Sequence, residues 1–226
     1  IILAMDIGSS PDKKYSENYQ SGPLSFEAIY KGEKIICNSG YFQNQNHKLN
    51  NISRSSVAHS TLILNNKSAS TFKKKNGQTF LENGLRSNNK NIVVEKNFWS
   101  IKCSHNGYLK DFGTLHERTL EFVPEINKIL GKDKLIKKSN YKSTNFEIRF
   151  HLMPNTKVTK TQDNRTVLIE LENSGWKFFT NHGLIGIETG LYFGKKNNYS
   201  ENQNIFISGK TEKEDQLIEW EISKIK

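Results

Sequence analysis

The sequence predicts an all-β fold: an antiparallel β-sandwich of the supersandwich type, with few or no helices. Short segments alternate apolar and polar residues with a period of two, which is the pattern of a strand with one buried face. Turns of Gly, Asn, Ser and Lys separate these segments at intervals of about 8–12 residues, as in sandwiches and barrels. No Pro-rich or Gly/Ser-rich linker interrupts the chain, so we predict one domain over residues 1–226.

The predicted strands follow one another along nearly the whole chain. The first two form a hairpin, because Lys31-Gly32-Glu33 makes a Gly-containing turn between them. The clearest alternation, at 146–152, places Phe, Ile and Leu on one face and Glu, Arg and His on the other. The predicted strands cover residues 24–30, 34–38, 60–64, 91–95, 98–103, 116–123, 146–152, 166–171, 175–179, 183–188, 204–208 and 217–222.

One segment has a helical pattern, and two loops are long. The pattern begins at Pro124 and is closed by Gly131, so we predict a short helix over 124–130, with a poorly formed strand and loop as the alternative. Residues 43–56 and 72–90 are long for hairpin loops. Long loops on a β scaffold are where sites are usually built, so we expect functional residues near them.

The two cysteines exclude a disulfide-rich scaffold. Cys37 and Cys103 lie in apolar, strand-like segments, and we expect both to be buried free thiols, with a single bridge as the alternative. No apolar run approaches the roughly 20 residues that a membrane-spanning helix needs, so we expect no membrane span.

The chain carries a formal charge of +10, which suits nucleic acid, anionic lipid or an acidic polymer as a partner. We do not expect nucleic acid, because the sequence lacks an aromatic and basic strand motif of the RNA-recognition type. The densest basic run, Lys73-Lys74-Lys75, is followed by Asn76-Gly77. It predicts either a solvated hairpin tip or a loop that faces an anion.

Candidate chemistry comes from histidines, because the common metal, nucleotide and nucleophile motifs are missing from the sequence. Arg54 precedes His59 at the start of a strand. Arg binds carboxylate or sulfate in a bidentate manner, and two imidazoles with a carboxylate suit Zn²⁺. The alternative is that lone strand histidines have structural roles, which we expect for His47, His151 and His182. The candidate substrate-binding residues are Arg54, Tyr108, His116 and Arg118.

An ordered set of segments resembles the C-terminal domain of heparinase II/III-like proteins. The resemblance covers nearly the whole chain and keeps the order of the segments. The ordered set, rather than any one motif, carries the resemblance. The family's His-Asn-Thr strand motif appears here as His59-Ser60-Thr61, with Ser in the middle position. The segments are residues 21–27, 35–40, 53–62, 105–108, 116–118, 146–152, 175–178 and 207–209.

The resemblance implies a two-part polysaccharide lyase. An N-terminal α/α toroid carries a Tyr and an Asn or His, and a C-terminal antiparallel sandwich contributes one more His. His59 takes that catalytic place in this sequence. In several members the sandwich also holds a structural metal, which implies His59 and His105 as ligands of Zn²⁺ or another divalent cation. No other cofactor is expected.

These observations predict the C-terminal domain of a lyase that cleaves an acidic, uronate-containing glycan, either sulfated or unsulfated, by β-elimination. The expected partners are an anionic polysaccharide and the toroid of the same protein, and the expected location is the periplasm or cell envelope of a bacterium. This chain alone should be inactive, because the catalytic Tyr belongs to the toroid. The alternative is a non-catalytic carbohydrate-binding or structural module.

Overall fold

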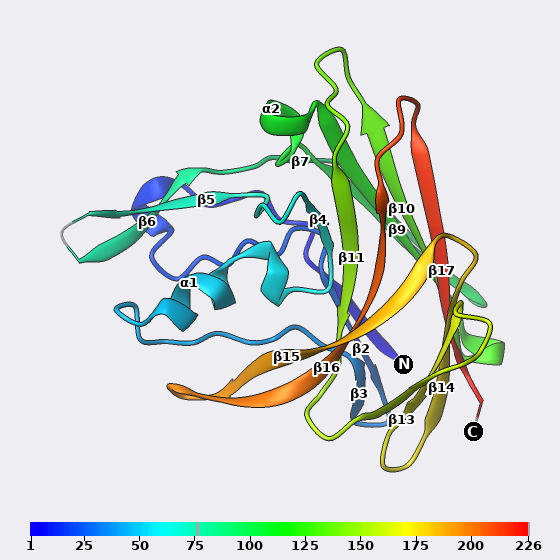
Figure 1. Cartoon of the computed structure of the whole chain (residues 1–226). Helices are drawn as coiled ribbons and strands as arrows, with labels where there is room; N and C mark the ends of the chain where they lie inside the picture. Colours follow the sequence, from blue (N-terminus) through cyan, green and yellow to red (C-terminus); the bar gives the residue numbers. More distant parts are fainter. Residues whose placement is uncertain (76, 226) are drawn as a thin grey trace.

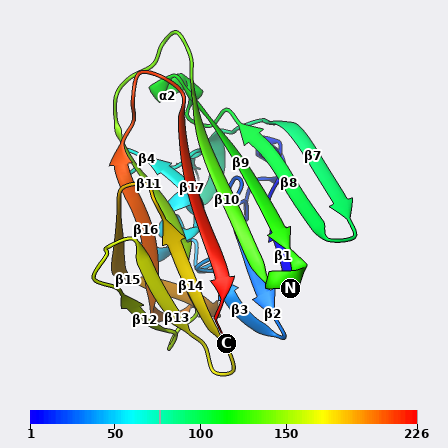
Figure 2. The same ribbon diagram turned by 90° about the vertical axis from the view of Figure 1, so that its right-hand side faces the viewer.

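The computed structural model describes residues 1–75 and 77–225 (Figure 1). One layer is a large antiparallel sheet, seen face on in Figure 2. Residues alternate between its two faces, and the inward side chains of its central strands are buried. Its strands, in spatial order, are β12 (Lys157–Lys160), β13 (Thr166–Glu170), β14 (Gly175–Thr180), β17 (Gln216–Lys224), β10 (Lys128–Lys137), β9 (Thr114–Val123), β8 (Phe98–His105) and β7 (Ser87–Glu95).

The second layer consists of two smaller antiparallel sheets. They meet at the end of β11, where the backbone N–H of Cys37 donates to the carbonyl of His151 at 2.9 Å. One sheet contains β15 (Leu184–Lys195), β16 (Asn198–Lys210), β11 (Asn145–His151) and β4 (Leu62–Leu64); the other contains β1 (Ile2–Met5), β2 (Phe26–Tyr30) and β3 (Glu33–Ile36).

An aromatic cluster fills the space between the layers. Trp220 of β17 stacks on Phe26 of β2 with ring centroids 5.4 Å apart, and Phe150 of β11 packs edge-on against Phe178 at 4.6 Å. Gly131 lies beneath Trp220, because a Cβ at that position would come within 2.1 Å of the indole ring. These contacts join strands from both layers, and the aromatic rings bury apolar area together with the aliphatic side chains of the core.

A group of shorter elements extends from one side of the sandwich (Figure 1). It contains η1 (Lys13–Tyr15), α1 (Lys48–Arg54), η2 (Ser56–Ala58) and the hairpin of β5 (Thr71–Lys75) and β6 (Gln78–Asn83). The two predicted long loops lie here. Neither is wholly irregular, since the first contains α1 and the second contains β6 and most of β5.

The structure confirms the antiparallel all-β sandwich and the strands predicted from alternation. The predicted helix at 124–130 is wrong: a single 3₁₀ turn, η3 (Pro124–Ile126), leads into β10, a central strand of the large sheet. The apolar-polar alternation does not reveal this strand, because two of its inward positions are Gly131 and Asp133 rather than large apolar residues. Asn76, in the predicted turn after the basic run, lies outside the described residues.

Cys37 and Cys103 are buried free thiols, as predicted. Burial raises the pKa of the Cys37 thiol to about 12. Among the described residues, no helix is long and apolar enough to cross a bilayer.

Candidate functional site

His59 lies directly after η2, where the chain leaves the group of short elements and enters β4. Its Nδ1 lies 2.9 Å from the carbonyl oxygen of Ser55. Because a carbonyl can only accept, Nδ1 carries the proton and Nε2 keeps a free lone pair. Nε2 makes no hydrogen bond to any described residue, and it is not among the fully buried polar atoms without a partner.

The imidazole of His59 is neutral at neutral pH. Burial lowers its pKa to about 4, and the hydrogen bond to Ser55 offsets only part of this effect. The residue is 6% exposed, whereas His105, His116 and His151 are between 0% and 2% exposed. His59 therefore presents a basic, uncharged nitrogen at the edge of the fold.

A strained turn packs against the imidazole of His59. The N–H of Ser25 donates to the carbonyl of Gly22, and Pro23 and Leu24 occupy the two central positions. Leu24 has a φ of 57°, which makes this a type II turn because Pro holds φ near −65°. The third position of such a turn normally takes Gly or Asn, and a buried Leu there costs roughly 1–3 kcal/mol.

Gly22 packs directly against the imidazole of His59. A Cβ on Gly22 would lie 2.4 Å from Cδ2 and 2.6 Å from Cγ of the ring. Glycine is thus required for this close approach to the Cγ–Cδ2 edge of the ring.

Buried side chains hold the backbone on both sides of His59. His151 Nε2 donates to the carbonyl of Val57 at 3.0 Å, and its Nδ1 accepts from Ser39 Oγ at 3.0 Å. The hydroxyl of Ser60 donates to the carbonyl of Cys37 and accepts from the His151 N–H. The Ser of the His-Ser-Thr motif thus ties the His59 segment to the junction of the two smaller sheets.

The two segments that contain His105 and His116 form a hairpin. His105 of β8 lies directly opposite His116 of β9, and His105 Nε2 is 3.1 Å from His116 Nδ1. His105 Nδ1 accepts from the N–H of Gly107, so its proton is on Nε2 and points to His116. His116 Nδ1 accepts the hydrogen bond from His105 Nε2–H, and the Nε2–H of His116 donates to Asp133 at 2.6 Å.

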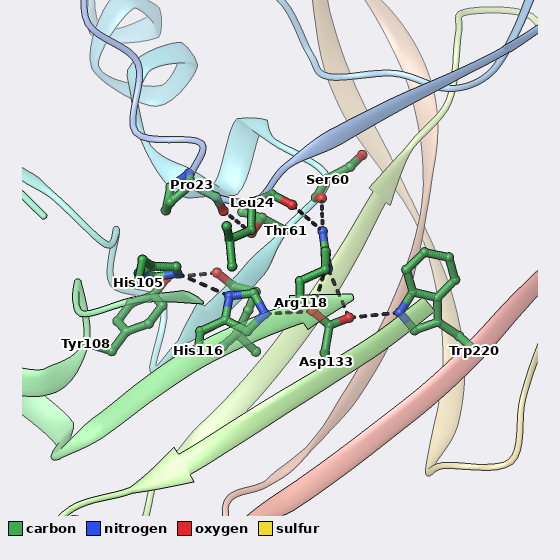
Figure 3. Close-up of polar contacts among 11 residues, drawn as sticks. Pro23, Leu24, Ser60, Thr61, His105, Tyr108, His116, Arg118, Asp133 and Trp220 are labelled. Carbon is green, nitrogen blue, oxygen red and sulfur yellow. Dashed lines mark hydrogen bonds and ion pairs between the residues drawn. The ribbon is translucent and has the colours of Figure 1, made fainter. Parts of the chain in front are cut away.

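Asp133 lies at the centre of this buried network (Figure 3). It accepts hydrogen bonds from His116 Nε2, from Nε and Nη2 of Arg118, and from Trp220 Nε1 at 2.8 Å. Burial by itself would raise the pKa of Asp133, but the charge of Arg118 and the hydrogen bond from His116 lower it well below its usual range. Burial lowers the pKa of His116, so its contact with Asp133 is a hydrogen bond from a neutral ring.

Arg118 reaches across the core from β9 to Leu24 and to Ser60, the residue after His59 (Figure 3). Its Nη1 donates to the carbonyl of Leu24 at 2.9 Å and to the carbonyl of Ser60 at 2.7 Å. The two predicted substrate-binding residues His116 and Arg118 are both fully buried. Their polar atoms are occupied by protein partners, which does not support direct contact with a glycan.

The remaining two predicted substrate-binding residues are also buried. Arg54 donates to the carbonyls of Tyr19, Ser16 and Thr79, and so connects α1 to η1 and β6. The hydroxyl of Tyr108 donates to the carbonyl of Leu62 at 2.8 Å, and burial raises the pKa of this phenol. Both have the geometry of structural residues, so neither is placed to contact a bound glycan.

The residues present do not fit a metal site at His59 and His105. Both ring nitrogens of His105 and Nδ1 of His59 are engaged by protein groups. Within residues 1–75 and 77–225, no group of three or more His, Cys, Asp or Glu side chains is arranged to hold a metal ion. We therefore derive no chemistry through a metal in this chain.

Sequence reasoning missed three residues of this region: Gly22, Asp133 and Trp220. Asp133 could have been found from strand pairing, because it lies directly opposite Arg118 in the β9–β10 ladder. The misassigned helix at 124–130 concealed that register. Gly22 carries no signal in the sequence alone, since its role depends on the approach of His59 from a distant segment.

Comparison with solved structures shows similar folds at low sequence identity. A mutant of the heparan sulfate lyase HepC from Pedobacter heparinus matches with a TM-score of 0.78 at 14% identity, covering 98% of this chain and 32% of that one. The heparinase III product of BT4657 matches with a TM-score of 0.70 at 17% identity, covering 91% and 30%. A further heparinase III structure matches with a TM-score of 0.65 at 15% identity, covering 91% and 29%.

This chain thus spans about a third of the length of these solved proteins. No curated protein matches it. The model of the family described as "Heparinase II/III-like, C-terminal" matches residues 1–221. The chain therefore belongs to the heparinase II/III-like family, in which it corresponds to the C-terminal domain.

Proposed function

We propose that this chain is the sandwich domain of a polysaccharide lyase that cleaves an acidic, uronate-containing glycan by β-elimination. The observation that carries the proposal is the geometry of His59, whose oriented imidazole presents a free Nε2 at the edge of the fold. Similarity to solved heparinases supports it. The toroid of the same protein would supply the rest of the active site.

In β-elimination a base removes the C5 proton of the uronic acid. The electron pair forms the C4–C5 double bond, the C4–O bond breaks, and the leaving oxygen takes a proton. A neutral imidazole cannot offset the substrate carboxylate by charge. His59 is suited instead to accept a proton at Nε2, while donors elsewhere in the cleft stabilise the carboxylate.

The charge of the chain supports an acidic substrate. Besides the formal charge of +10, a surface hollow is lined by Lys13 and Lys14 of η1, Lys73 and Lys75 of β5, and Phe80 of β6. Such a combination of ammonium groups and an aromatic face suits a sulfated or carboxylated sugar. We further propose a periplasmic or cell-envelope location in a bacterium, which cell fractionation would test.

The test uses the full-length protein and follows unsaturated uronides by their ultraviolet absorbance. Replacing His59 by Ala should lower kcat by roughly 100-fold, within the range for removal of a general base. His182→Ala is the matched control, because that ring lies outside the His59 pocket against Phe146. Unchanged turnover in His59→Ala would remove the catalytic role.

A second candidate function is a non-catalytic glycan-binding module, which the lysine-lined hollow favours. It predicts salt-sensitive binding of acidic polysaccharides by the full-length protein without release of unsaturated products. Glycan titration and the absorbance assay on the same preparation distinguish the two functions.

A further inference from the structure

Arg118 connects the two segments that surround the imidazole of His59. Through Nη1 it donates to the carbonyl of Leu24, in the turn that packs Gly22 against the ring, and to that of Ser60, the residue after His59. The two segments are distant in sequence, and the guanidinium group contacts both of them (Figure 3). A displacement of the guanidinium would therefore move both segments that adjoin the imidazole of His59.

Asp133 sets the orientation of that guanidinium. Its Oδ1 accepts from Nε at 2.7 Å and its Oδ2 accepts from Nη2 at 3.1 Å, a bidentate arrangement that fixes the plane of the group. Bonds from His116 and Trp220 hold the carboxylate in turn. The pair is completely buried, so water does not compete for these contacts.

The turn next to His59 needs such support, because its backbone is strained at Leu24. Three contacts hold it: Arg118 to the Leu24 carbonyl, Thr61 Oγ1 to the Pro23 carbonyl at 2.6 Å, and the Leu24 N–H to the Asp6 carbonyl at 2.9 Å. Strained backbone persists where the surrounding structure over-determines it, and it concentrates at functional sites.

Stability alone is a weak reason to bury this ion pair. Desolvation offsets most of the attraction between buried charges, and well-packed apolar residues often stabilise a core equally well. What apolar side chains cannot do is donate to two carbonyls at once and hold a fixed geometry between them. The buried ion pair therefore points to a need to hold the carbonyls of Leu24 and Ser60 in fixed positions.

We propose that Arg118 and Asp133 are positioning residues for His59, which they act on through the Gly22–Leu24 turn and the Ser60 carbonyl. The inference rests on the proposed function, because it assigns the network to the active-site histidine of that proposal. It differs from the sequence prediction, in which Arg118 contacts the substrate itself.

The first test is Arg118→Lys in the full-length protein. Lysine keeps the positive charge beside Asp133, but a single ammonium group cannot reproduce the bidentate pair together with both carbonyl contacts. We expect kcat to fall by at least about tenfold with KM changed less than about twofold, because misplacement of a reacting group affects the chemical step.

A second readout does not depend on activity. Exchange of the imidazole C2 hydrogen with deuterium, followed by mass spectrometry, reports the pKa and accessibility of each histidine. In Arg118→Lys we expect the pKa of His59 to rise towards its usual value and its exchange to accelerate. His182, which lies outside the network, should keep its exchange rate and serves as the internal reference.

Thr61→Val tests the same link without disturbing the buried charges. It removes the hydrogen bond to Pro23 and should change the His59 exchange in the same direction as Arg118→Lys. Thr180→Val is the matched control: its hydroxyl also donates to a carbonyl at 2.6 Å and the residue is also buried, but it contacts neither segment. Because the His182 N–H donates to the Thr180 hydroxyl, His47 replaces His182 as the reference in this variant.

The outcomes separate this inference from the proposed function. If Arg118→Lys and Thr61→Val fold and leave both the exchange of His59 and kcat unchanged, Arg118 and Asp133 are core residues only and the inference is overturned. If the exchange of His59 changes in both variants while His59→Ala retains full activity, the positioning stands and the catalytic role of His59 fails.

Discussion

The contact between Gly22 and the imidazole of His59 leads to a prediction at the scale of single residues. Gly22→Ala places a methyl group within van der Waals overlap of the ring, which must then move. We expect roughly 100-fold lower kcat in the full-length enzyme, the effect typical of a displacement of about 1 Å. Steady-state turnover of an acidic glycan measures it.

The matched control for this change is Gly8→Ala, where the nearest atom to an added Cβ is Asp6 Oδ1 at 3.2 Å. That variant should keep near-normal turnover. Equal loss in both variants would show that the effect comes from general destabilisation and not from the position of His59.

The protonation of His59 predicts the acid limb of the activity profile. A base acts only when unprotonated, so activity falls as the pH decreases through its pKa, which burial lowers to about 4. We therefore expect kcat/KM of the wild-type enzyme to show no loss from His59 between pH 7 and about 5. An acid limb centred near the usual His value of about 6.5 that His59→Gln abolishes would contradict this assignment.

At the scale of elements, the junction between α2 (Leu109–Phe112) and β9 depends on Gly113. This residue ends α2 with a φ of 61°, and a Cβ there would lie 2.4 Å from the backbone of Asn140 and Tyr141. Gly113→Ala should lower the free energy of unfolding by more than about 2 kcal/mol, since a positive-φ cost and a backbone clash add. The midpoint of urea denaturation measures the change.

Gly32→Ala separates the two contributions. Gly32 in the β2–β3 turn has a φ of 89°, but an added Cβ meets nothing within 4 Å. Gly32→Ala should lower the free energy of unfolding by only about 1 kcal/mol, because only the backbone conformation is unfavourable there. A loss as large as that of Gly113→Ala would mean that the approach of residues 140–141 is unimportant.

Strand pairing decided which predictions at this scale succeeded. The segment at 146–152 alternates cleanly because every inward residue of β11 before His151 is apolar, and the strand is present as predicted. The helix predicted at 124–130 is wrong because β10, which begins at Lys128, carries glycine and aspartate on its inward face and so lacks a clear alternation. Side chains of the neighbouring strands accommodate those two residues: Trp220 covers Gly131, and Arg118 and His116 bind Asp133.

At the scale of the whole molecule, buried neutral histidines predict a loss of stability in acid. Burial lowers the pKa of His151 to about 3 and that of His59 to about 4, whereas both titrate near 6.5 in the unfolded chain. Their contribution is complete above pH 6.5 and is lost as the pH falls towards 3. Below pH 6.5, each of the two histidines lowers the free energy of unfolding by up to about 1.4 kcal/mol per pH unit.

Urea denaturation of the full-length protein between pH 7 and 4 checks this dependence. His151→Gln should be less stable at pH 7, because the contacts to Val57 and Ser39 change, but its stability should fall less steeply with acid. An equal slope in wild type and variant would assign the acid sensitivity to other groups.

The hollow between η1 and β5 predicts salt-dependent glycan binding. The double substitution Lys73→Gln and Lys75→Gln should weaken binding of a heparin-like polymer by the full-length protein by about tenfold at low salt and much less at high salt. The matched control replaces Lys157 and Lys160 of β12, an edge strand of the large sheet. Equal weakening by both pairs would indicate net charge alone.

The amino-acid sequence by itself determined the fold class and most strands, because alternation is a local property that the burial of one sheet face imposes on each strand. That His105 and His116 face each other depends on the pairing of β8 with β9, which the structure shows. Only the tertiary structure decided which polar residues face inward and which remain open. Arg118, His116 and Asp133 are buried because strands far apart in the chain enclose them, and His59 keeps an open nitrogen because its distant neighbours leave one edge uncovered.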